Sequence, residues 1–180
     1  DIIPYGNLKK LLDALADATR VASVIVDLQG DVLVGPERFS AFCRLMRDNP
    51  ATREHCLCAT RHLEKTADET RKPCTVECAN LNIITACSPI MVNGEHTANW
   101  ILGHVVKTRV PNNLVRRFAE QNGLPVRETV RAYLSLPLVS EKEFRKTLRL
   151  LTLFTSILSD TACKNYLLRQ ADTEKERLLS

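Results

Sequence analysis

The sequence predicts an α+β domain in which antiparallel strands alternate with helices. Two hairpin signals support this class. Gln29-Gly30 separates two short runs rich in β-branched residues, and Asn93-Gly94 separates two longer ones. A tight turn makes the strands on either side antiparallel neighbours. The segments between and after these hairpins have apolar residues at helical spacing, which favours helices packed on one sheet over a doubly wound parallel fold.

An amphipathic helix and the first hairpin make up the start of the chain. Asn7 is a suitable N-cap for this helix, and the apolar pattern stops near Arg20. Four leucines share one face of the helix, Leu8, Leu11, Leu12 and Leu15. Residues 22–28 and 31–34 then form the two strands of the hairpin.

Two helices and a second hairpin follow. The longer helix is expected over residues 52–72, after Pro50. A shorter helix precedes it and is marked by Phe42, Leu45 and Met46. Residues 74–79 form a short extended segment, and residues 83–92 and 99–108 form the strands on either side of the Asn-Gly turn.

Helical spacing returns in the last third of the chain. Residues 112–122 and 126–134 each predict a helix, with Gly123 as a stop signal for the first. A long helix then runs from about Ser140 to the end. Apolar residues lie on several faces of its first part, which indicates burial against both the sheet and a second protomer. These residues are Leu148, Leu150, Leu151, Leu153, Phe154 and Ile157. Beyond Cys163 a weak heptad favours either a signalling coiled coil or a frayed end.

Length and composition limit the class of protein. A chain of 180 residues with 44% apolar residues can close one sizeable core. Its net charge of +4 is spread among 21 acidic residues, so no basic stripe for nucleic acid is present. No apolar run reaches the roughly 18 residues of a membrane span, and no signal peptide is visible. We therefore expect a cytoplasmic domain without membrane contact, cut at both ends from a longer chain.

Cysteine and histidine residues are concentrated between residues 43 and 104. The chain has seven cysteines, an odd number that suits a reducing compartment. His55, Cys58 and His62 share one face of the long helix, at spacing acceptable for metal ligands. Because this face is charged, we expect it to be exposed to solvent, while Cys56 points inward.

The thiols allow more than one interpretation. Cys43, Cys56, Cys74 and Cys78 could together hold an iron–sulfur cluster or zinc, if the fold brings them together. Alternatively they are reduced thiols packed as small apolar side chains. Cys78 with His104 is the pair to test for nucleophilic catalysis. No catalytic motif accompanies that pair, so we do not expect an enzyme.

Five short segments resemble the PocR sensory domain family. They are Phe42-Cys43-Arg44, His55-Cys56, Glu77-Cys78-Ala79-Asn80-Leu81, Ser88-Pro89-Ile90-Met91-Val92-Asn93-Gly94 and Trp100-Ile101-Leu102-Gly103-His104-Val105. The resemblance covers about residues 5–160. It implies a PAS/GAF-like fold, with a curved antiparallel sheet, flanking helices, a ligand cavity and a long C-terminal signalling helix. It also implies small hydrocarbon-derived ligands such as diols, with metal or redox sensing in some relatives.

The resemblance also indicates site residues. Cys43, Cys56 and Cys78 match cysteines of the family pattern. The ligand is expected between the sheet and the cysteine-bearing helices, with Phe42 and Trp100 closing the site. The chain departs from the family at two places: His104 stands where glutamine is common, and a glycine near residue 80 is missing. A histidine can bind metal or titrate near neutral pH, so the ligand can differ from a diol.

The expected function is that of a sensory input domain of a bacterial signal-transduction protein. Residues 1–162 form the sensory domain, and residues 163–180 start a signalling helix toward an output domain absent here. That output is a histidine kinase, a cyclic-dinucleotide enzyme or a transcriptional regulator. A parallel homodimer through the last helix is expected. The alternatives are a metal, iron–sulfur or redox sensor, and a structural dimerisation module.

Overall fold

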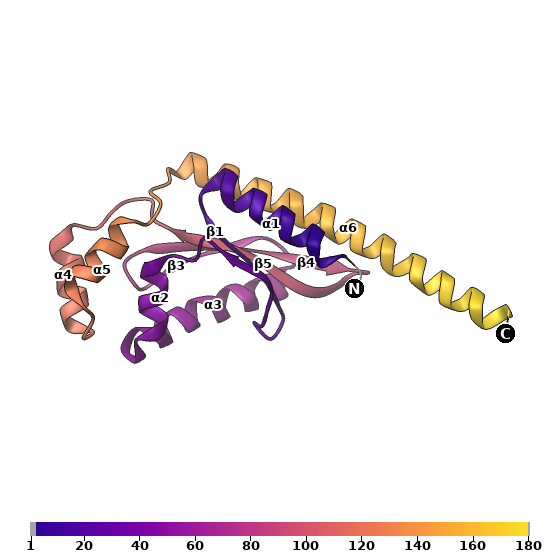
Figure 1. Cartoon of the computed structure of the whole chain (residues 1–180), viewed down its shortest axis with the longest axis horizontal. Helices are drawn as coiled ribbons and strands as arrows, with labels where there is room; N and C mark the ends of the chain where they lie inside the picture. The colour runs from indigo at the N-terminus through magenta and orange to yellow at the C-terminus, as the bar shows by residue number, and fades with distance from the viewer. Residues whose placement is uncertain (1–2, 180) are drawn as a thin grey trace.

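A five-stranded antiparallel sheet forms the centre of the computed structural model, which describes residues 3–179 (Figure 1). The strand order is β2-β1-β5-β4-β3, and every neighbouring pair is antiparallel. The strands are β1 (Ala22–Asp27), β2 (Val32–Glu37), β3 (Cys74–Cys78), β4 (Ile83–Val92) and β5 (Glu95–Val105). The outer limits of the two predicted parts of the chain, at residues 1 and 180, lie outside the described residues.

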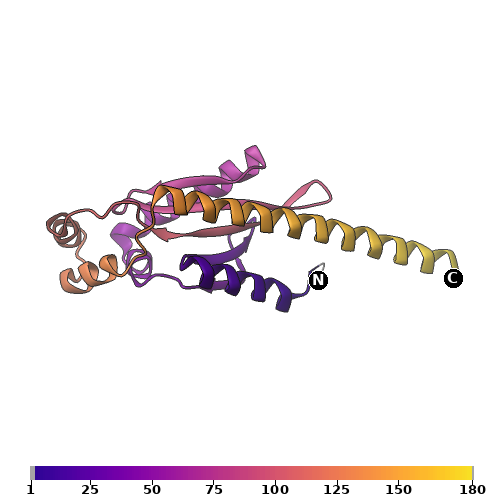
Figure 2. The same cartoon turned by 90° about the horizontal axis from the view of Figure 1, so that it is seen from above.

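Helices cover both faces of the sheet. They are α1 (Tyr5–Thr19), α2 (Ala41–Asp48), α3 (Pro50–Thr70), α4 (Asn112–Gln121), α5 (Val126–Leu134) and α6 (Glu141–Leu179). Helices α1 and α6 lie on one face, and α2 and α3 lie on the other (Figure 1). Helices α4 and α5 pack together beyond one end of the sheet, and α6 extends far past the opposite end (Figure 2). The α+β class with a PAS/GAF-like sheet, flanking helices and a long C-terminal helix is confirmed.

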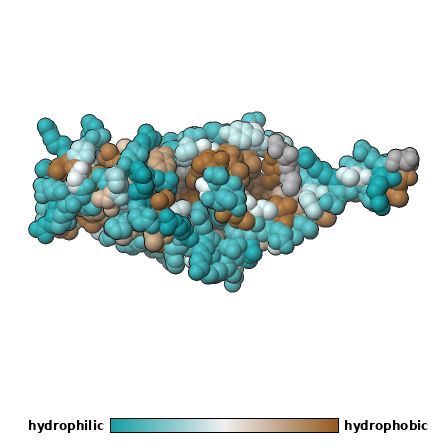
Figure 3. All heavy atoms as spheres, turned by 90° about the horizontal axis from the view of Figure 1, so that it is seen from below, coloured by the Kyte–Doolittle hydropathy of each residue, from teal (hydrophilic) through white to brown (hydrophobic). Residues whose placement is uncertain are grey.

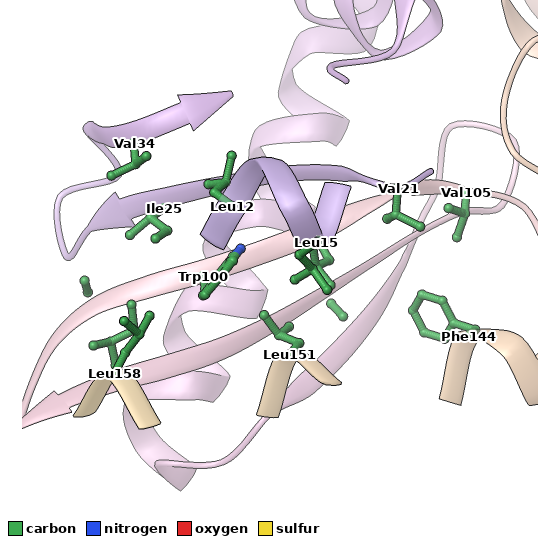
Figure 4. Close-up of a cluster of buried hydrophobic side chains, with 14 of the residues drawn as sticks. Leu12, Leu15, Val21, Ile25, Val34, Trp100, Val105, Phe144, Leu151 and Leu158 are labelled. Carbon is green, nitrogen blue, oxygen red and sulfur yellow. The ribbon is translucent and has the colours of Figure 1, made fainter. Parts of the chain in front are cut away.

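The main core fills the space between the sheet and helices α1 and α6 (Figure 4). Trp100 of β5 is fully buried there, together with Leu15 of α1 and Leu151 of α6. The Trp100 ring stacks on Phe154 at 6.2 Å, and its Nε1–H donates to Ser23 Oγ at 2.8 Å. The indole therefore brings apolar contact without leaving its polar atom unpaired.

Helix α6 is attached to the sheet by hydrogen bonds as well as by apolar packing. The hydroxyl groups of Ser88 on β4 and Thr155 on α6 are 2.7 Å apart and buried. One helical turn further, Ser159 Oγ accepts from the backbone N–H of Met91 at 2.9 Å. Polar partners at fixed points define the register of α6 on β4 in a way that apolar contacts alone do not.

Other apolar side chains on α6 face away from the sheet. Leu150, Leu153 and Ile157 are 41%, 53% and 52% exposed. The expected burial of this segment against its own sheet is thus confirmed for one face only. Contact with a second protomer stays a prediction.

Both turn signals formed the hairpins expected from them, β1-β2 and β4-β5. The expected cap at Asn7 is wrong, because α1 starts at Tyr5 and Pro4 occupies the N-cap position. Helix α3 begins at Pro50, where the side chain of Asn49 accepts from the N–H of Ala51 at 2.8 Å. Across residues 3–179, no helix is long and apolar enough to span a membrane.

Candidate functional site

A β-bulge at His104 shapes the site. Thr85 pairs with Gly103 and Ile84 pairs with Val105, so His104 is an extra residue on β5. Its φ of 62° lies in the left-handed region, which is strained for a residue with a side chain. Leu102 and Val105 both join the core beneath α1 and α6, although residues three apart on a regular strand face opposite sides. The extra residue thus turns the His104 side chain toward α2 and α3.

The surroundings of His104 define its protonation. Its Nδ1 accepts from the backbone N–H of Ser40 at 3.3 Å, and the ring of Phe39 contacts it edge-on at 4.6 Å. Burial, with a smaller contribution from the charge of Arg47, lowers the pKa of His104 to about 3. The ring is therefore neutral near pH 7. Because Nδ1 accepts, the proton of the neutral ring is on Nε2, which is available to donate.

A cavity of about 130 Å³ lies beside His104, between the sheet and α3. Much of its wall is apolar, Val24, Val26, Val32, Pro36, Phe39 and Ile101. Its polar lining residues come from both sides of the gap, Arg47, Thr60, Glu64, Thr85 and His104. Figure 3 shows the face of the molecule that carries α3, where apolar side chains gather in patches within a largely polar surface. Apolar walls with a few converging polar groups are typical of small-molecule sites.

Opposite charges line this cavity without pairing. In the described part of the chain, no ion pair includes Arg47 or Glu64. The Arg47 guanidinium lies 5.1 Å from the centre of the Phe39 ring. Burial raises the pKa of the Glu64 carboxyl, and the charge of Arg47 opposes that shift. A ligand in the cavity can thus meet a strong donor and a strong acceptor.

A smaller cavity of about 40 Å³ adjoins the first, and three cysteines line it. Arg47, Thr60, Thr85 and His104 line both cavities, so the two lie side by side. Cys43 comes from α2, Cys56 from α3 and Cys78 from β3. The fold therefore brings together the three cysteines that match the family pattern.

The three thiols differ in acidity. The neighbouring Cys78 thiol lowers the pKa of Cys56 to about 7 despite partial burial. The same interaction, together with burial, raises the pKa of Cys78. Burial raises the pKa of Cys43 to about 11. Cys56 is therefore the thiol most ready to ionise.

Asn80 supports Cys56 from the turn after β3. Its amide Nδ2 donates to Cys56 Sγ at 3.2 Å and to the carbonyl oxygen of Thr52 at 3.2 Å. Asn80 is 1% exposed, and its Oδ1 has no hydrogen-bond partner among the described residues. Asn80 is therefore a buried side chain that contacts a cavity thiol.

Cys74 lies away from the other three cysteines of the expected metal site. It is four residues from Cys78 along β3, which corresponds to about 13 Å. It pairs in register with Cys87 on β4, whose Sγ donates to Asn99 Oδ1 at 3.3 Å. Between residues 3 and 179, no group of three or more histidine, cysteine, aspartate or glutamate side chains is arranged to hold a metal ion. The structure therefore does not bring the four expected ligands to one point.

The two expected aromatic residues line neither cavity. Trp100 belongs to the core on the opposite face of the sheet, because it alternates with Ile101, which does line the larger cavity. Phe42 is buried behind α2, against the ring of Tyr133 at 5.5 Å. His104 lines both cavities. Cys78 and His104, the pair nominated for catalysis, both line the smaller one, and no hydrogen bond between them occurs in the described residues.

Several lining residues were not expected from the sequence. Arg47 and Glu64 look like ordinary surface charges of helices, and Thr85 like an ordinary strand residue. Only their positions across the sheet and α3 reveal a shared site. His55, Cys58 and His62 are exposed, as expected, while Cys56 is partly buried on the inner side of α3.

The fold and the cavity define a sensor-type domain, with a small-molecule hollow on one face of the sheet and a long helix on the other. The chain belongs to the PocR sensory domain family: residues 1–163 match the model described as the sensory domain found in PocR. It is also similar to the "Regulatory protein PocR" of Salmonella typhimurium (strain LT2), with 27% identity over 95 residues. That match spans 53% of this chain and 31% of the relative.

Proposed function

We propose that this chain is the sensory input domain of a bacterial signal-transduction protein and catalyses no reaction itself. The observation that supports this most directly is the hollow beside His104, where a strained bulge turns a neutral histidine donor toward unpaired Arg47 and Glu64. Strained backbone concentrates at ligand and active sites. The name of the Salmonella relative, a regulatory protein, agrees with this role.

The ligand we propose is small, hydrocarbon-derived and oxygen-bearing. The larger cavity, at about 130 Å³, has room for only a few non-hydrogen atoms. Its apolar walls suit a short carbon chain. Arg47 and His104 Nε2 can donate to ligand oxygens, while Glu64 can accept from a hydroxyl group.

Strand β4 is the proposed route from the cavity to α6. Thr85 faces the cavity, and Ser88, three residues further along β4, faces α6 and contacts Thr155. Residues three apart on a strand lie on opposite faces, so one strand contacts both the ligand site and the helix. A ligand shifts α6 only if it binds one arrangement of the helix more tightly than another.

The remaining features of the proposal concern the parent protein. Residues 163–180 would lead into an output domain, either a histidine kinase, a cyclic-dinucleotide enzyme or a transcriptional regulator, in the cytoplasm. The exposed side chains of Leu150, Leu153 and Ile157 support a homodimer through α6. This domain is not proposed to bind nucleic acid or membranes.

Thermal unfolding of the reduced chain with a panel of small alcohols, aldehydes and carboxylates tests the ligand proposal. A compound that binds only the folded state at 100 times its Kd adds about 2.7 kcal/mol of stability. That corresponds to a rise of roughly 5–11 °C in Tm for a chain of this size. Arg47→Gln should reduce the shift, whereas Arg44→Gln, an exposed change on the same helix that avoids the cavity, should not. No shift with any compound would leave the dimerisation module as the better explanation.

A further inference from the structure

The small cavity places two thiols of different elements against each other, and ligand binding alone does not require them. Cys56 on α3 and Cys78 on β3 both line this cavity of about 40 Å³, and each thiol shifts the pKa of the other. Apolar residues of the same size would pack equally well here. The pair therefore suggests chemistry in addition to the proposed ligand binding.

We propose that Cys56 and Cys78 are a reversible dithiol–disulfide pair that reacts with small hydroperoxides entering through the ligand cavity. Cys56 is the attacking thiol, and Cys78 is the thiol that closes the disulfide. This proposal adds a modification site to the domain. It does not depend on which organic ligand, if any, occupies the larger cavity.

The exposure of Cys56 and its hydrogen bond from Asn80 assign the attacking role to this thiol. It is partly exposed, whereas Cys43 and Cys78 are only 8% and 9% exposed. Thr60 and His104 line both cavities, so a small oxidant in the larger cavity lies within one side chain of the cavity that Cys56 lines. The Asn80 amide, 3.2 Å away, donates to Cys56 Sγ and orients it.

The reaction balances with one hydroperoxide. The Cys56 sulfur attacks one peroxide oxygen, so an S–O bond forms while the O–O bond breaks. The departing oxygen takes the thiol proton, leaving as water from hydrogen peroxide or as an alcohol from an organic hydroperoxide. Cys78 sulfur then attacks the Cys56 sulfenic acid, an S–S bond forms, and water leaves. Two equivalents of an external thiol reverse the change.

The other cysteines are less suited to these roles. Cys43 is buried on α2, and its interaction with Cys56 is through-space only. Cys74 and Cys87 form a second neighbouring pair, but Cys87 is fully buried and neither residue lines a cavity described above. Cys58 is exposed on α3 and lines neither cavity, which makes it a matched control for exposure and helix position.

Peptide mapping after mild oxidation tests the pair. The reduced chain is treated with equimolar hydrogen peroxide, quenched by alkylation, digested without reductant and analysed by mass spectrometry. We expect a peptide linked through Cys56 and Cys78 in the wild type and in Cys58→Ser, which dithiothreitol removes. Cys56→Ser and Cys78→Ser should lose that peptide.

Trapping the intermediate separates the two roles. In Cys78→Ser, oxidation should stop at a Cys56 sulfenic acid that dimedone labels, while Cys56→Ser should give no such label at Cys78. Circular dichroism of each variant shows whether it is folded. A wild-type protein that forms no disulfide, one that links other cysteines, or one that oxidises Cys58 as fast as Cys56 would overturn the proposal. The ligand panel above uses reduced protein, so either proposal can fail without the other.

Discussion

Gly103→Ala is expected to destabilise the domain because the sheet leaves no room for a side chain there. A Cβ atom at this position would lie 2.7 Å from Thr85 Oγ1, 2.8 Å from Thr85 Cγ2 and 2.9 Å from Thr85 Cα. Rotation of the Thr85 side chain cannot relieve the contact with Cα. Overpacking of this kind costs about 1–3 kcal/mol. For a chain of this size, Tm should fall by roughly 2–12 °C.

The assay is thermal unfolding followed by circular dichroism, with two comparison variants. Gly6→Ala is the matched control, since nothing lies within 4 Å of its added Cβ and α1 favours alanine; its Tm should equal or slightly exceed that of the wild type. The double variant Thr85→Ala with Gly103→Ala should recover only the part of the Tm loss that comes from contacts with the threonine side chain. Gly103→Ala as stable as the wild type would refute the packing argument at the bulge.

Three further predictions concern charge, reactivity and packing. Folded His104 stays neutral down to about pH 3, whereas in the unfolded state it takes up a proton below about pH 6.5. The free energy of unfolding should therefore fall as the pH drops through that window, by up to roughly 1.4 kcal/mol per pH unit. Denaturant titrations at several pH values should show a smaller loss in His104→Gln. Iodoacetamide should label Cys56 with a midpoint near pH 7, and a clearly alkaline midpoint would contradict the proposed interaction with its neighbours. Leu151→Ala, a fully buried change, should cost about 2–5 kcal/mol in urea unfolding, whereas Leu153→Ala, at a half-exposed position, should cost much less.

Local signals predicted most of the fold. The Asn93-Gly94 turn specified the β4-β5 hairpin, because its residues tolerate the positive φ values of 52° and 82° found there. Helical spacing placed α4 and α5 within a residue or two of their limits. The helix start at Tyr5, after Pro4 at the N-cap position, was missed, since proline does not cap through a side chain and Asn7 gave the more familiar signal.

The site depends on contacts that sequence spacing does not contain. The bulge at His104 follows from the register between β4 and β5, and it decides which face of the sheet His104 joins. The same alternation puts Trp100 in the opposite core. Cys74 and Cys78 looked equivalent as a C-x3-C pair, but they lie at opposite ends of strand β3, and each has a different cysteine neighbour.

The length of α6 beyond the sheet amplifies small movements at its base. Ala162 is the last buried residue on the helix, and residues 163–179 continue as one helix for about 25 Å. A rotation of about 10° at the Ser88–Thr155 contact would displace the far end, about 36 Å away, by roughly 6 Å, given the helix rise. Under the proposed function, α6 would act as a lever arm, in which a small rotation at the Ser88–Thr155 contact becomes a displacement about as wide as a side chain at the tip.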